Sequence, residues 1–205
     1  MALSADQLRS SLDALAAIEP AFAPALARIG YPAPRASPRG YATLLRTILG
    51  QQVSVQSANA HWRKLGEVIG NAADPALLIA ASDEQLRAAG LSRQKAGYAR
   101  SLAGLIVAGE LELSALPADD EDAIALLTRV KGIGRWSAEI YLLFAEGRAD
   151  VFPAGDLAVQ IELGRILGHK ERPSEKALRA LAEAWSPHRG AAAIFAWNHY
   201  NTTVI

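Results

Sequence analysis

Apolar residues recur at helical spacing along most of this sequence, and glycine, proline and serine separate the runs. Near the start, Leu8, Leu12 and Leu15 form one stripe, and Ser4 with Gln7 forms a capping box ahead of it. No segment shows a strong strand pattern. The pattern therefore predicts an all-α protein. Further helices are expected to begin near Ser54, Ser82, Ser92, Asp119, Asp156 and Ser174.

The most informative stretch, residues 126–160, contains two glycines between two helical patterns. Gly132 and Gly134 bracket Ile133, with Ile124 and Leu127 before them and Ile140 and Leu143 after them. Glycine takes positive φ without steric cost, so this spacing predicts a tight hairpin. A hairpin that opens a helix presents free N–H groups, which bind a phosphate well. The stretch is therefore either a phosphate clamp or a plain helix–turn–helix corner.

A carboxylate follows the hairpin by about twenty residues. Residues 151–156 read VFPAGD, in which Pro153 and Gly155 end one element and Asp156 begins the next. Asp156 is a candidate functional carboxylate at the mouth of a helix, and a simple helix N-cap is the alternative.

Composition limits the classes of function. The 205 residues contain no cysteine, which excludes disulfides and a cysteine-ligated iron–sulfur cluster. The four histidines show no metal-ligand spacing, and the sequence has neither a membrane-length apolar run nor a secretion signal. A cytoplasmic protein is therefore expected. The net charge is zero, so binding to DNA requires a local basic face. Candidates for that face are Arg93, Lys95, Arg100, Arg129, Lys131 and Arg135.

The string VKGIGRWSAE at residues 130–139, the spacer and the Pro-x-Gly-Asp segment together resemble a known signature. It is that of the helix–hairpin–helix DNA glycosylases, which combine this motif with a Gly/Pro-rich loop and an aspartate. The tryptophan after the hairpin is similar to that of the DNA-3-methyladenine glycosylase II family. Lys131 departs from the superfamily pattern, which has proline there.

The segment ILGQQVSVQSA at residues 48–58 resembles the part of the family that pushes a wedge into DNA. That match places Gln52 at the wedge position and Gln51 beside it. An ordinary polar junction between helices, with Ser54 as an N-cap, is the alternative.

The resemblance also implies roles for other residues. Asp156 would be catalytic, and Trp136 and Trp197 would line the base pocket. Phosphate binding would fall to the residues around the hairpin, namely Lys131, Gly132, Gly134, Arg135 and Trp136. A structural Na⁺ or K⁺ ion would bind the backbone carbonyls of Thr128, Val130 and Ile133, and no other cofactor is expected.

The expected fold has two helical lobes with a DNA-binding and base-binding cleft. Residues 1–205 would form a single glycosylase domain. The hairpin motif spans about 123–145, and the N-terminal segment joins the C-terminal helices in the second lobe.

The implied function is monofunctional removal of alkylated bases of the 3-methyladenine type from double-stranded DNA, in base excision repair, by a monomer. Two alternatives remain open at this point. One is a non-catalytic helix–hairpin–helix DNA-binding module, and the other is a glycosylase/lyase for oxidised bases.

Overall fold

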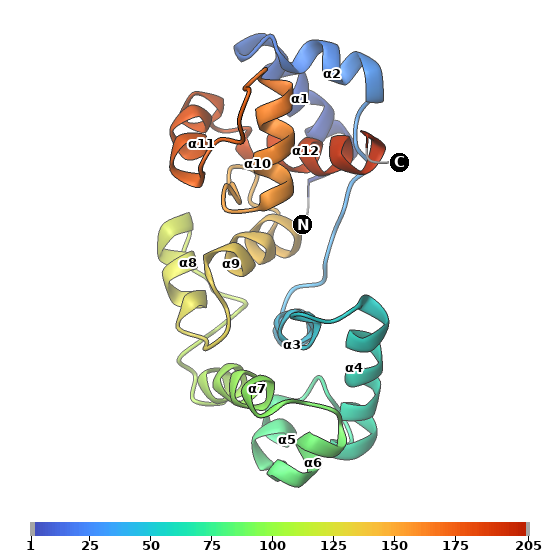
Figure 1. Cartoon of the computed structure of the whole chain (residues 1–205). Helices are drawn as coiled ribbons and strands as arrows, with labels where there is room; N and C mark the ends of the chain where they lie inside the picture. Colours follow the sequence, from blue (N-terminus) through green and yellow to red (C-terminus); the bar gives the residue numbers. More distant parts are fainter. Residues whose placement is uncertain (1–2, 204–205) are drawn as a thin grey trace. The chain divides into compact units, whose positions relative to one another are not determined.

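The computed structural model describes residues 3–203, and every regular element in that part of the chain is helical (Figure 1). The predicted all-α class is therefore confirmed. The chain divides into two compact units. The first unit consists of Met1–Ser37 and Leu142–Ile205, and the second consists of Pro38–Tyr141. Each unit is described separately below.

The first unit combines helices from both ends of the sequence, so the blue α1 and α2 accompany the orange and red helices in Figure 1. Its elements are α1 (Ala5–Ile18), α2 (Phe22–Ile29), the π-helical turn η1 (Leu142–Glu146), α10 (Leu157–Ile166), α11 (Glu175–Ala182), the 3₁₀ turn η2 (Glu183–Trp185) and α12 (Arg189–Thr203). Aromatic packing fills its core. The rings of Phe22 and Trp185 meet edge to face at 5.5 Å, and Phe195 lies 6.1 Å from Phe22.

The second unit is built around one helix with a buried apolar face. Its elements are α3 (Tyr41–Gly50), α4 (Val55–Ile69), α5 (Pro75–Ala80), α6 (Asp83–Ala88), α7 (Arg93–Val107), α8 (Asp120–Thr128) and α9 (Arg135–Tyr141). Helix α3 packs against α4, α7 and α9. Its leucines Leu44, Leu45 and Leu49 have no exposed surface, because three neighbouring helices cover them.

Local side-chain caps start most of these helices where the sequence predicts them. Ser4 with Gln7, and Ser82 with Gln85, form complete capping boxes. Ser54 and Ser92 each accept the backbone N–H three residues later. The short helix α5 was not predicted, although Asp74 followed by a proline is a typical start signal.

None of the helices among residues 3–203 is both long enough and apolar enough to cross a lipid bilayer.

One ion pair fastens the segment before α10 to the start of α12. Arg189 donates from Nε to Oδ1 of Asp150 at 2.9 Å and from Nη2 to Oδ2 at 2.7 Å. Ser186 donates to the same Oδ2 at 2.7 Å. Burial raises the pKa of Asp150, but these hydrogen bonds outweigh burial and hold the pKa below its ordinary value of 3.8. The charged carboxylate therefore stabilises the first unit.

We expect Asp150→Asn to lower the free energy of unfolding by about 1–2 kcal/mol at pH 7, because the bidentate ion pair is lost. The wild-type advantage is fully present above the unfolded pKa and is lost as the pH falls through the lowered pKa of the folded state. Urea unfolding of both proteins at several pH values tests this. A difference that stays constant from pH 7 to pH 2 would contradict it.

Candidate DNA-binding and active site

A six-residue turn joins α8 to α9, as the sequence predicts, but its two glycines have different roles. Gly132 has φ +87°, and a Cβ built there would lie 2.2 Å from the ring of Tyr98. Gly134 does not have a positive φ, and nothing lies within 4 Å of a Cβ built there. The fold of the turn therefore requires glycine at position 132, whereas the space beside Gly134 is open.

Backbone N–H groups are exposed where α9 begins. The carbonyl of Gly134 accepts the N–H of Ala138 at 3.0 Å, so the helix starts directly after this glycine. Within residues 3–203, no hydrogen bond uses the N–H of Gly132 or Gly134. These two donors, at the positive end of a helix, suit an anionic oxygen.

The carbonyls proposed for a monovalent cation lie on the same turn. Val130 accepts the N–H of Ile133 at 3.0 Å. In the described part of the chain, no hydrogen bond ends on the carbonyls of Thr128 or Ile133. Na⁺ and K⁺ ions bind to backbone carbonyl oxygens, so these carbonyls fit such an ion. No group of three or more His, Cys, Asp or Glu side chains among the described residues is placed to hold a metal.

The charged residues beside the hairpin differ from the sequence prediction. The exposed side chain of Arg135 is held by two carboxylates, because its Nε donates to Oε1 of Glu139 at 3.0 Å and its Nη atoms donate to Glu121. The hydrogen bond to Glu121 is the largest cause that raises the pKa of Arg135. These carboxylates compete with a phosphate for the guanidinium, and the role of Arg135 as a phosphate ligand remains a prediction. Lys131 is exposed and remains a candidate.

The wider basic face is also smaller than predicted. Arg100 pairs with Asp83, and Arg129 pairs with Glu110. Lys95 donates to the carbonyl of Leu49 at 2.7 Å, and burial lowers its pKa. Of the six candidates, three have no ion pair within the described residues, namely Arg93, Lys95 and Lys131, and of these Lys95 is engaged by the carbonyl of Leu49.

The turn between α3 and α4 separates the two candidate wedge residues. Gln51 donates from Nε2 to the carbonyl of Gly132 at 2.7 Å, so this side chain braces the hairpin. Gln52 is exposed and has φ +56°, the one positive φ outside glycine among residues 3–203. A left-handed backbone conformation at a residue other than glycine lowers the stability of the fold by roughly 1 kcal/mol. Val53 and Val55 are 38% and 79% exposed, so the apolar residues of this turn are not part of the core.

Trp136 lies on the first turn of α9 with 46% of its surface exposed. Trp136 continues the helical spacing of Ile140 and Leu143, and yet its indole is exposed. An exposed indole can stack on the planar ring of a base, and the base-pocket role of Trp136 remains a prediction.

Asp156 occupies the N-cap of α10, in the first unit. Its Oδ1 accepts the N–H of Val159 at 3.0 Å and the indole Nε1–H of Trp197 at 3.1 Å. The N-cap alternative is thus also correct, but an N-cap does not require an indole donor. The preceding loop is rigidly held, since Gln160 donates to the carbonyl of Ala154 and Arg179 to that of Phe152. The carboxylate is therefore fixed in position at a helix N-terminus, where negative charge is favoured.

An aromatic pair lies beside this carboxylate. The rings of Trp197 and Phe144 are 5.6 Å apart, and the guanidinium of Arg35 lies 5.1 Å from the centre of the Phe144 ring. These side chains line a cavity of about 170 Å³ in the first unit. Sequence reasoning missed the roles of Phe144 and Arg35, because a helical apolar pattern and a proline-rich loop gave no sign that they would meet.

The structure thus brings Asp156 and Trp197 together in the first unit. Trp136, Gln51, Gln52 and the hairpin belong to the second unit. The pairing of Trp136 with Trp197 in one base pocket remains a prediction.

A family model described as "HhH-GPD superfamily base excision DNA repair protein" matches residues 45–188, well over half of the chain. The chain belongs to the HhH-GPD superfamily. The matched range contains the hairpin and Asp156, while Trp197 lies just outside it.

Individual HhH-GPD proteins support a narrower placement. The crystal structure of a DNA-3-methyladenine glycosidase from Bacillus halodurans is 32% identical, with a TM-score of 0.76, over 83% of this chain and 79% of that one. A 3-methyladenine DNA glycosylase from Schizosaccharomyces pombe, in complex with abasic DNA, has a TM-score of 0.78 at 26% identity, over 96% of this chain and 97% of that one. These matches confirm the resemblance to the methyladenine glycosylases.

A candidate DNA-3-methyladenine glycosylase from Bacillus subtilis is 27% identical over 165 residues, or 77% of this chain. The chain spans only 58% of the length of that relative.

The two hairpin glycines lead to a matched pair of predictions. We expect Gly132→Ala to destabilise the second unit by roughly 2 kcal/mol or more, because the new Cβ collides with Tyr98 and the φ is unfavourable. Gly134→Val meets no such obstacle and should fold normally, but it should weaken binding to damaged and undamaged duplexes about equally.

Thermal unfolding and fluorescence anisotropy with both duplexes separate these effects. Gly97→Ala, at another site with open space, is the control for folding. A Gly134→Val variant that folds and binds undamaged DNA like wild type would disprove the phosphate clamp.

Proposed function

We propose that this HhH-GPD protein is a monofunctional DNA glycosylase that hydrolyses the N-glycosidic bond of alkylated bases, such as 3-methyladenine, in double-stranded DNA. The observation that carries the proposal is Oδ1 of Asp156, shared by a helix N-cap and the indole of Trp197. That arrangement holds one carboxylate at a fixed place beside an aromatic ring. The family of the chain and the Schizosaccharomyces pombe relative in complex with abasic DNA support the same activity.

DNA binding in this proposal begins at the hairpin. The N–H groups of Gly132 and Gly134, with Lys131, bind a backbone phosphate near the lesion, and this contact positions the protein without identifying the base. We propose that a Na⁺ or K⁺ ion on the carbonyls of Thr128, Val130 and Ile133 stiffens the same turn. Trp136, which follows the turn, belongs to this contact or to the base pocket.

Excision requires the nucleotide to leave the duplex, because the reacting bond is inaccessible inside the stack. Gln52, exposed at the tip of its turn, would fill the vacated space. Gln51 cannot do so without giving up its hydrogen bond to the hairpin, so its role is to hold the turn in place.

A positively charged alkylated base suits an aromatic site. Its electron-poor ring is attracted to an indole face by stacking and cation–π contact, each worth about 0.5–2 kcal/mol. The same charge makes the base a good leaving group, so the enzyme need not protonate it. Departure of the base produces an oxocarbenium-like sugar.

Asp156 would act on that sugar. Its negative charge stabilises the developing cation, and the carboxylate positions or deprotonates the attacking water. The hydrogen bonds from Val159 and Trp197 hold the carboxylate in position for this role.

Replacement of Asp156 by asparagine is the decisive substitution. The hydrogen bonds from Val159 and from Trp197 end on Oδ1, and an asparagine Oδ1 can accept these two bonds. We therefore expect Asp156→Asn to keep its stability and its affinity for DNA. Base release should fall by about 10³-fold or more, since about 4 kcal/mol of transition-state stabilisation disappears.

Single-turnover release of methylated bases from a duplex measures this effect, and Asp13→Asn, an exposed carboxylate of the same unit, is the control. Release at the wild-type rate by Asp156→Asn would refute the catalytic assignment. DNA binding without any base release by the wild type would instead favour a non-catalytic binding module.

The second prediction concerns the nucleophile. Relatives that also cut the strand place a lysine two residues after the second hairpin glycine, where its amine attacks C1′ and forms a Schiff base. Trp136 stands at that position, and an indole cannot act in this way. We expect an intact abasic strand as product and no covalent adduct after borohydride reduction on a lesion-bearing duplex.

Lys131 lies before the hairpin, and the amine of Lys95 is bound to the carbonyl of Leu49, so neither lysine is a ready substitute. A high yield of trapped adduct that disappears when one lysine is mutated would overturn the monofunctional assignment. That result would favour the alternative function, a glycosylase/lyase for oxidised bases.

A further inference from the structure

Two titratable side chains that the proposed chemistry does not use are buried in the first unit. Glu162 on α10 is 0% exposed, and His199 on α12 is 4% exposed. A buried carboxylate is tolerated only when hydrogen bonds or opposite charge compensate for the lost water. The contacts around Glu162 show what compensates it, and they link α10 to α12.

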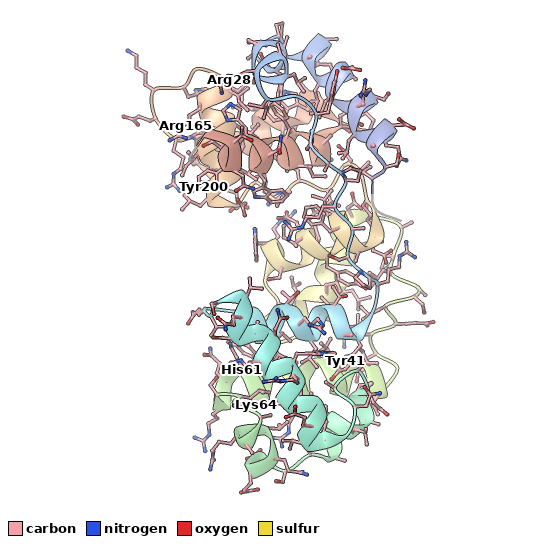
Figure 2. The ribbon with its side chains drawn as sticks, turned by 90° about the vertical axis from the view of Figure 1, so that its right-hand side faces the viewer. Arg28, Tyr41, His61, Lys64, Arg165 and Tyr200 are labelled. Carbon is pink, nitrogen blue, oxygen red and sulfur yellow. The ribbon has the colours of Figure 1, made fainter. Side chains whose placement is uncertain are left out.

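Each oxygen of Glu162 has its own partner. Oε2 meets Nδ1 of His199 at 2.6 Å, and Oε1 meets Nη1 of Arg165 at 2.6 Å. The other ring nitrogen of His199, Nε2, is in contact with Nη2 of Arg28 on α2. Arg28 and Arg165 line a cavity of about 530 Å³ and can be followed in Figure 2. The network therefore runs from solvent through a buried carboxylate–imidazole pair.

The contact with Arg28 assigns the roles of the two ring nitrogens of His199. A guanidinium has only donors, so Nε2 of His199 accepts the hydrogen bond. Nδ1 then donates its proton to Glu162. His199 is thus a directional link between α12 and α10.

This link lies close to the proposed reaction centre along both helices. Asp156, the N-cap of α10, lies six residues before Glu162. On α12, Trp197 precedes His199 by two residues. The bond from Trp197 to Asp156 is the second cross-link between the same two helices. Two links at different points determine both the rotation and the sliding of α12 on α10. A one-residue change of register would turn the indole by about 100° and move it by about 1.5 Å.

We propose that Glu162 and His199 are a positioning pair that orients the indole of Trp197, and through it the carboxylate of Asp156, for base excision. The pair does not touch substrate and acts through Trp197. This inference rests on the proposed glycosylase function. Its structural part, that the pair fixes the bond between Trp197 and Asp156, can be tested without any activity.

The test must separate orientation from stability. Loss of one partner would leave the other buried and unsatisfied, which can unfold the protein. The variant of choice is therefore the double replacement Glu162→Met with His199→Phe, which exchanges both partners for apolar groups of similar size. Such exchanges are often neutral for stability, while the directional link is removed. His199→Asn is the rescue variant, because its amide takes the place of Nδ1 and can still donate to Glu162.

The first measurement is the ¹⁵N–¹H signal of the Trp197 indole, assigned by its disappearance in Trp197→Phe. We expect the signal to move in the double variant and to stay in place in His199→Asn and in the surface control Asp13→Asn. An unmoved indole signal in a folded double variant would overturn the proposal. This result holds whether or not the protein excises bases.

The second measurement is the single-turnover rate of methylated-base release, with the affinity for undamaged DNA measured alongside. The double variant should lose about 10- to 100-fold in rate at nearly unchanged affinity, because small misplacements near reacting groups have effects of that size. In a Trp197→Phe background the same double replacement should cost less than about threefold, since the group it acts through is already changed. Equal losses in both backgrounds, or a His199→Asn rate as low as that of the double variant, would contradict the positioning role.

A wild type that releases no methylated base would refute the proposed function, and the indole signal would still decide whether the pair positions Trp197.

Discussion

One carboxylate oxygen, Oδ1 of Asp156, connects the start of α10 to the middle of α12. It accepts a backbone N–H that a helix start would otherwise leave unpaired, and it accepts the indole N–H of Trp197. The first bond fixes the carboxylate relative to its own helix, and the second fixes the aromatic ring relative to the carboxylate. The contacts of Trp197 with Phe144, and of Phe144 with Arg35, extend outward from this point.

The two units carry different kinds of chemistry in the proposed function. The hairpin, with Gly132 and Gly134, offers backbone donors that read only a phosphate, so its action is independent of sequence and of damage. The first unit holds a charged group and aromatic faces, which respond to the charge of the base. The proposal assigns DNA binding and bond cleavage to different units, so it predicts that substitutions can alter each of them separately. The chain passes from one unit to the other where α9 is followed directly by η1, at Tyr141 and Leu142.

Local features of the fold were predictable because they depend on neighbours in sequence. The capping boxes at Ser4 and Ser82, the N-cap at Asp156 and the hairpin around Gly132 each involve residues within a few positions. The pattern also indicated an all-helical chain. Only the complete string from the hairpin to Asp156 made an enzyme the better interpretation than a helix corner.

The features that escaped prediction join residues far apart in sequence. Arg135 pairs with Glu121, which lies fourteen positions earlier in the sequence. Val53, Val55 and Trp136 are apolar and yet exposed, and periodicity alone cannot tell a buried face from an exposed one. The pair of Glu162 and His199 gave no sign in the sequence, since 37 residues separate them.

The backbone of Gln52 has a consequence for engineering. A glycine there would relax the left-handed conformation and raise the melting temperature, whereas the side chain proposed as the wedge would be lost. Under the proposed function, a screen that selects only for heat resistance would therefore enrich proteins that bind DNA well and insert poorly. Thermal tolerance would then be a misleading guide to activity at this one position.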